Sequence, residues 1–154
     1  MDALELHEQA LTAYQQGQFD QAIEWLKEAI QLQPQPKFYC HLGNILKEKG
    51  HLDEAISYYA HALTLQEDDI LHNNIANALQ QKGKIALALA HYDKALQYNR
   101  NSANVHNNLG NVLLQLGKTR QAIQHFHRAL QIEPENDQWY VNLGNAFQDL
   151  GLLE

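Results

Sequence analysis

The sequence predicts an all-α solenoid, in which antiparallel helix pairs stack along one axis. The first observation is an internal repeat, because glycines recur at intervals of 33, 33, 34 and 34 residues, at Gly17, Gly50, Gly83, Gly117 and Gly151. The second is that apolar residues between these glycines follow helical spacings of three and four, without the period-two alternation of a strand. One helical hairpin cannot bury its own apolar face, whereas a stack of hairpins can.

Small residues share this register, which supports closely packed hairpins. Each glycine is preceded, seven residues earlier, by Ala10, Gly43, Ala76, Gly110 or Gly144, and the first four are followed by Ala22, Ala55, Ala88 and Ala122 and then by Ala29, Ala62, Ala95 and Ala129. Two helices joined by a short turn approach closely only where their crossing point carries little side chain. A larger residue recurs at Leu26, Tyr59, Tyr92 and Phe126 and is expected to fill the space between hairpins.

We therefore divide the chain, as one domain over residues 1–154, into four full repeats and one extra first helix. The repeats cover residues 3–35, 36–68, 69–102 and 103–136, and a half repeat covers 137–154. The polar leading helix of 3–35 suits a terminal cap, whose outer face meets water. Pro34 and Pro134 end the second helices of 3–35 and 103–136. In 103–136 the two helices are traced by Val105, Leu109, Val112, Leu113 and Leu116, and by Ile123, Phe126, Leu130 and Ile132.

The half repeat stops where a second helix would begin. Phe147 and Leu150 would lie against that helix, so we expect an N-terminal fragment of a longer protein. One alternative is that the last helix is a solvating cap. Another is self-association, in which an open end at residues 150–153 of this C-terminal helix docks onto another chain.

The repeat itself resembles a known family. The segment from Ala103 to Asn136, ANVHNNLGNVLLQLGKTRQAIQHFHRALQIEPEN, resembles a tetratricopeptide repeat, and the resemblance covers almost the whole chain. The early aromatic position departs from the pattern at Leu6, His72 and His106, and the closing proline at Glu67 and Arg100. The resemblance implies a right-handed superhelix whose first helices line a concave face. It also implies a protein-interaction scaffold or adaptor.

Asparagines dominate the stripe that would face this groove. Positions 6 and 9 of successive repeats carry His41 and Asn44, Asn74 and Asn77, Asn108 and Asn111, and Asn142 and Asn145. An Asn side chain offers one acceptor and two donors, the groups that a peptide bond needs, so we predict that these residues hold an extended peptide by its backbone. The stripe resembles the asparagine-lined repeats of O-linked N-acetylglucosamine transferase and of kinesin light chains. Further lining groups would be Lys37, Cys40, Lys47, Ile70, Leu114 and Val141, of which Lys47 is a candidate peptide contact.

A packing role competes with binding at position 9, where Asn belongs to the pattern of the family and helps neighbouring first helices to pack. At position 6 the binding interpretation is favoured, because a helix interior disfavours Asn. Two functional alternatives also stay open. The chain could be the substrate-recognition arm of an enzyme, such as a glycosyltransferase, whose catalytic domain follows Glu154, or it could be a self-assembling scaffold.

Composition argues against several other classes of protein. The net charge of −7 disfavours nucleic acid, and the single Cys40 excludes a disulfide framework and a Cys-rich zinc site. No apolar run approaches the roughly 18 residues of a membrane span, and the acidic N-terminus is unlike a signal peptide, so we expect a cytoplasmic protein. No phosphate-binding glycine loop and no catalytic Cys–His arrangement is present. We expect no cofactor, no metal and no enzymatic activity. We also expect no clamp of the kind that co-chaperones use, because the predicted inner face carries no Lys or Arg in the third to fifth repeats.

Overall fold

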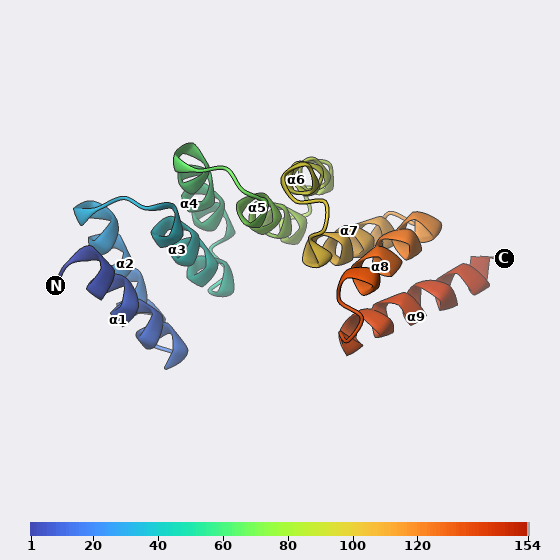
Figure 1. Cartoon of the computed structure of the whole chain (residues 1–154), viewed down its shortest axis with the longest axis horizontal. Coiled ribbons are helices and arrows are strands. Elements are labelled where there is room, and N and C mark those ends of the chain that lie inside the picture. Colours follow the sequence, from blue (N-terminus) through green and yellow to red (C-terminus); the bar gives the residue numbers. More distant parts are fainter. Residues whose placement is uncertain (154) are drawn as a thin grey trace.

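The computed structural model describes residues 1–153, with side chains up to residue 151. This part of the chain contains nine helices and no strand, and the helices form an arch (Figure 1). The helices are α1 (Ala3–Gln15), α2 (Phe19–Leu32), α3 (Pro36–Glu48), α4 (Leu52–Leu65), α5 (Asp69–Gln81), α6 (Ile85–Tyr98), α7 (Ala103–Gln115), α8 (Thr119–Ile132) and α9 (Asp137–Leu153). The predicted all-α superhelical solenoid is confirmed. None of these helices is both long and apolar enough to cross a bilayer, as judged over the described residues.

The turns within the hairpins depend on glycine. Gly83 and Gly117 have φ angles of 81° and 76°, a left-handed conformation that strains any residue with a Cβ. The following amides close each helix end, since Lys84 N donates to Leu79 O and Lys118 N to Leu113 O, both at 2.9 Å. This is the Schellman pattern, which satisfies carbonyls that the helix leaves free.

The predicted close crossings lie inside two hairpins. A Cβ built on Gly43 would lie 2.6 Å from the Tyr59 ring, and one on Gly110 would lie 2.6 Å from the Phe126 ring. Both rings are fully buried, so each fills the space that its glycine leaves. Gly144 on α9 differs, because nothing in the described structure lies within 4 Å of its Cβ position.

The first helices of the repeats form the inner side of the arch. α3 contacts α5, α5 contacts α7, and α7 contacts α9, whereas successive second helices make no comparable contacts in the described chain. Figure 1 accordingly places α3 and α5 along the inner curve, with α4 and α6 outside them. The concave face that the family resemblance implies is therefore built from the first helices.

The end of the chain differs from the repeat pattern. Gly151 is helical and lies within α9 rather than in a turn, although it continues the glycine series. The side chains of Leu152 and Leu153, which belong to the open end expected to self-associate, lie outside the described residues. Leu150 packs partly buried against the core, and Phe147 is exposed.

Candidate functional site

The inner helices are joined by a regular series of side-chain contacts. With repeats numbered from their first residues, position 5 of one repeat meets position 6 of the next. The contacts are His7 Nε2 to His41 Nδ1 at 2.7 Å, Asn74 Nδ2 to Cys40 Sγ at 3.6 Å, Asn108 Nδ2 to Asn73 Oδ1 at 3.0 Å, and Asn142 Nδ2 to Asn107 Oδ1 at 3.0 Å. We call these four contacts the inter-repeat ladder. It brings together four of the predicted site residues, one at every repeat junction.

The ladder fixes the position-6 amides without exhausting them. Asn74, Asn108 and Asn142 are half-buried, and each donates one N–H bond to its neighbour. Each amide has a second N–H and a carbonyl oxygen. Asn142 Oδ1 accepts a long bond of 3.4 Å from Gln138, while the Oδ1 atoms of Asn74 and Asn108 have no partner among the described residues. The result is a row of oriented amides with remaining hydrogen-bonding capacity.

The position-9 asparagines divide into two groups. Tyr59 donates its hydroxyl to Asn44 Oδ1 at 2.6 Å, and Tyr92 donates to Asn77 Oδ1 at 2.5 Å. Burial raises the pKa of both tyrosines, so both hydroxyls stay protonated donors. In the next repeat Phe126 lacks a hydroxyl, and Asn111 has no hydrogen-bond partner in the described structure. Asn44 and Asn77 therefore serve hairpin packing through their oxygens, while their N–H groups are not used in these contacts.

Two other predicted residues make fewer contacts. Asn145 on α9 is exposed and has no hydrogen bond within the described residues. Lys47 lies two turns beyond Cys40 on α3, and its partial burial lowers the pKa of its ammonium group. No hydrogen bond in the described chain joins Lys47 to the inter-repeat ladder. These two residues are therefore less well oriented than the position-6 amides.

The first contact of the inter-repeat ladder, which we call its first rung, is formed by two titratable side chains, His7 and His41. The rings of His7 and His41 stack with a centroid distance of 4.9 Å and an interplanar angle of 9°. Burial, followed by the charges of His41 and Lys37, lowers the pKa of His7 to about 4, and burial with Lys37 also lowers the pKa of His41. Both rings are therefore neutral near pH 7, when one nitrogen donates its proton to the other.

A pocket lies at the α3–α5 junction, on the same inner surface. Its volume is about 330 Å³, and it is lined by Pro36, Lys37, Cys40, His41, Asn44, Gln66, Asp68, Ile70 and Leu71. The predicted groove residues Lys37, Cys40 and Ile70 thus surround one cavity with His41 and Asn44. Burial and the nearby Asp68 raise the pKa of Cys40, which keeps it a thiol. This environment does not activate a nucleophile.

Comparisons with known families agree with this architecture. A model described as "TPR repeat" matches residues 10–50 and 76–117, and two models described as "Tetratricopeptide repeat" match residues 36–69 and 103–136. The matches of the first model alone cover more than half of the chain. The chain belongs to the tetratricopeptide repeat family. Repeats of this family form interaction scaffolds, which supports a protein-interaction role for the chain.

Solved tetratricopeptide repeat structures share the fold at low sequence identity. One chain in the crystal structure of the APC/C hetero-tetramer Cut9–Hcn1 superposes with a TM-score of 0.84 at 24% identity, over 95% of this chain and 30% of that chain. MamA gives a TM-score of 0.80 at 21% identity, over 93% of this chain and 85% of that one. YrrB, described as a TPR protein with an unusual peptide-binding site, gives a TM-score of 0.74 at 21% identity, over 96% of this chain and 77% of that one. No curated protein matched the chain in sequence.

Sequence reasoning missed part of this tetratricopeptide repeat site. His7 was not predicted to belong to it, and Asn73 and Asn107 were not recognised as the acceptors that orient position 6. A signal was present, since positions 5 and 6 both carry hydrogen-bonding groups at each of the four junctions. Which of these groups meet depends on how neighbouring first helices are aligned, and the structure gives that alignment. The structure also adds Asp68 to the pocket that surrounds Cys40.

Proposed function

We propose that this tetratricopeptide repeat domain is a non-catalytic scaffold that holds an extended peptide in the concave groove through asparagine side chains. The observation that carries the proposal is the row of half-buried position-6 amides, each oriented by the inter-repeat ladder and each retaining hydrogen-bonding groups. A peptide backbone presents alternating donors and acceptors, which such amides can match regardless of side-chain sequence.

Preorganisation supports this use of the amides. A flexible Asn would lose rotamer freedom on binding, whereas Asn108 and Asn142 are already held by bonds of 3.0 Å. Each new hydrogen bond contributes about 0.5–1.5 kcal/mol net. Four or five such bonds, set against the entropy of ordering a peptide, predict an affinity that is roughly micromolar or weaker.

The pocket at the α3–α5 junction provides a place for one anchoring side chain. Its volume of about 330 Å³ accommodates a single large residue. The lining combines apolar Ile70 and Leu71 with the opposite charges of Lys37 and Asp68. We expect an anchor with an apolar body and a polar end, such as Tyr or Gln, and backbone capture along the remaining groove.

Peptide selection tests this proposal. Random linear peptides displayed on phage are selected against the wild-type domain, and the affinity of the best peptide is measured for a groove variant, N108A/N111A/N142A. We expect binding to weaken by at least about tenfold, as the loss of several net hydrogen bonds requires. Circular dichroism checks that helicity is retained.

A matched control separates binding from packing. The variant N73A/N107A removes the same two ladder bonds as N108A/N142A but leaves the position-6 amides in place. It should retain more affinity than N108A/N142A. Equal affinity of the groove variant and the wild type would contradict peptide capture by these asparagines.

A further inference from the structure

Two equivalent histidine pairs lie within the third and fourth hairpins, and none of their four residues belongs to the inter-repeat ladder. His72 Nδ1 lies 3.1 Å from His91 Nδ1, and His106 Nδ1 lies 3.1 Å from His125 Nδ1. The ring centroids are 5.3 Å apart in both pairs. His72 and His106 are buried. The two pairs allow one repeat to be compared directly with the next.

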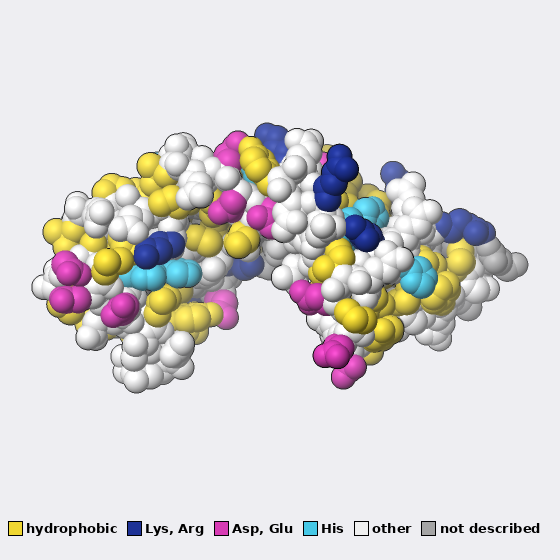
Figure 2. Space-filling view, viewed as in Figure 1, with side chains coloured by type: hydrophobic (Ala, Val, Ile, Leu, Met, Phe, Trp, Pro, Cys, Tyr) yellow, Lys and Arg dark blue, Asp and Glu magenta, His cyan; other side chains and the backbone are white. Residues whose placement is uncertain are grey.

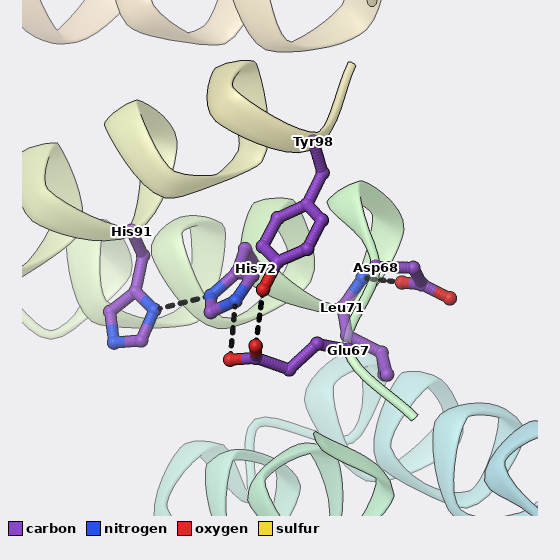
Figure 3. Close-up of polar contacts among 6 residues, drawn as sticks. All are labelled: Glu67, Asp68, Leu71, His72, His91 and Tyr98. Atoms are coloured by element: carbon purple, nitrogen blue, oxygen red, sulfur yellow. Dashed lines mark hydrogen bonds and ion pairs between the residues drawn. The ribbon is translucent and has the colours of Figure 1, made fainter. Parts of the chain in front are cut away.

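In the third repeat the protein places its own carboxylate beside the pair (Figure 3). Glu67 Oε1 lies 3.4 Å from His72 Nε2, which is an ion-pair distance, and the Tyr98 hydroxyl donates to Glu67 Oε2. The hydrogen bond from Tyr98 is the main cause that lowers the pKa of Glu67, followed in the same direction by His72 and Lys94. An oxyanion is therefore already accommodated at this junction.

One repeat further along, the acidic partner is replaced by basic groups. Glu67 follows the C-cap of α4, and Arg100 follows the C-cap of α6 in the same way. Arg128 stands at the position of Lys94, and Ile132 at that of Tyr98. The internal carboxylate and its hydroxyl donor are both lost, while positive charge is gained.

A pocket of about 350 Å³ opens at this second junction. It is lined by Leu96, Arg100, His106, Gln124, His125 and Arg128, and we call it the Arg100–Arg128 pocket. Arg128 is held in place, since Nη2 donates to Asn101 Oδ1 at 2.7 Å and Nη1 to Gln131 Oε1 at 3.4 Å. Figure 2 shows basic side chains beside a histidine on this face of the arch. The pocket shares no residue with the predicted peptide groove. It gathers basic side chains although the chain as a whole is acidic.

The proton arrangement leaves one histidine nitrogen open to a ligand. His106 Nε2 lies 2.9 Å from Arg100 O and must donate to it, because a carbonyl only accepts. With its proton on Nε2, His106 accepts at Nδ1 from the Nδ1–H of His125. His125 Nε2 is left as a lone pair, which becomes a donor when the ring is protonated. Burial, followed by His106, lowers the pKa of His125, while Asp93 on α6 acts in the opposite direction. A bound anion would act in the same direction as Asp93 and oppose this lowering.

We infer that the Arg100–Arg128 pocket binds an oxyanion, a carboxylate or phosphate group, presented by an acidic or phosphorylated side chain of a protein partner. Two guanidinium groups supply donors in the planar geometry that such oxyanions match, and Gln124 adds an amide. The carboxylate of Glu67 in the preceding repeat is the internal counterpart of this ligand. The site is independent of peptide capture in the groove.

Titration by NMR tests the inference. Inorganic phosphate and succinate are added separately at pH 7, and the side-chain resonances of Arg100, Arg128 and the His125 ring are followed. We expect saturable shifts of these resonances. Tighter binding of phosphate would indicate a phosphorylated source, and tighter binding of succinate an acidic one.

The repeats supply the matched variants. R100E installs the residue type that the preceding repeat already accommodates, so it should fold normally and weaken anion binding by about tenfold or more. R128Q should also weaken it. K94Q alters the equivalent position of the third repeat and should leave binding unchanged. Absence of saturable shifts with both anions, or equal affinity of R100E, R128Q and the wild type, would overturn the site.

Discussion

At the scale of single residues, one structural role is filled by different chemistries. The inter-repeat ladder uses a His–His contact at its first junction, Cys–Asn at the second and Asn–Asn at the last two. Only the first rung carries groups that titrate near neutral pH. Since the pKa of His7 is lowered to about 4 from the ordinary histidine value of 6.5, the folded chain holds fewer protons than the unfolded chain between these two values. Stability therefore falls as the pH drops through this window.

This rung makes a prediction about pH. The variant H7N/H41N recreates the Asn–Asn rung of the later repeats and removes both titrating groups. We expect the wild type to lose about 1–2 kcal/mol more stability than the variant between pH 7 and pH 5, because the shifted histidines resist protonation in the folded state. Urea unfolding at the two pH values measures the difference. An identical loss of stability in both proteins would show that the His7–His41 contact does not cause the pH dependence.

The asparagines illustrate what residue patterns can and cannot predict. Their position on the inner face followed from the repeat register, and the structure places the first helices there. The partners did not follow from the pattern. Tyr92 lies 15 residues after Asn77, and Asn108 lies 35 residues after Asn73, so both contacts depend on how separate helices are rotated and aligned. A helical period gives the face of a residue, but not the neighbour that it meets.

At the scale of helices, glycine sets the distance between partners in a hairpin. Gly43 and Gly110 lie directly against the Tyr59 and Phe126 rings, whereas Gly144 occupies the same repeat position with no such ring beside it. The small residue at all three positions predicts closely packed helices. Each ring lies 16 residues after its glycine, on the second helix of the hairpin, and the given sequence ends ten residues after Gly144, so it contains no corresponding ring. Gly151 lies in a helix although its spacing matches that of the turn glycines.

Alanine substitutions test this role of glycine. G43A and G110A should each destabilise the fold by about 1–3 kcal/mol, because the new methyl group overpacks a buried ring. G144A is the matched control and should be neutral, or stabilising by up to about 1 kcal/mol, since alanine favours a helix. Thermal unfolding measures all three variants. Destabilisation of equal size in G43A and G144A would exclude the ring contact as the cause.

At the scale of the whole molecule, contacts between the first helices give the arch its concave side. The fold class was predictable because each repeat contributes an independent copy of the same signal, at a spacing that chance does not produce. The functional surface was less predictable, because it is made at the junctions between repeats. The groove amides, the α3–α5 pocket and the Arg100–Arg128 pocket all combine residues from neighbouring hairpins.

Backbone capture by the groove makes a distinctive prediction at this scale. If the asparagines bind main-chain groups, affinity must depend on the amide hydrogens of the peptide rather than on most of its side chains. Replacing the peptide side chains outside the anchor by alanine should then change binding little. N-methylation removes one backbone donor without altering the side chain.

The most direct measurement is the affinity of the selected peptide after N-methylation at each residue in turn, determined by isothermal titration calorimetry. We predict a loss of about tenfold at the positions that face Asn108 and Asn111, with smaller effects between them, as the periodic contact of an extended chain requires. Uniform tolerance of N-methylation, with strong sensitivity to side-chain replacement throughout, would contradict capture of the peptide backbone by the inner asparagines.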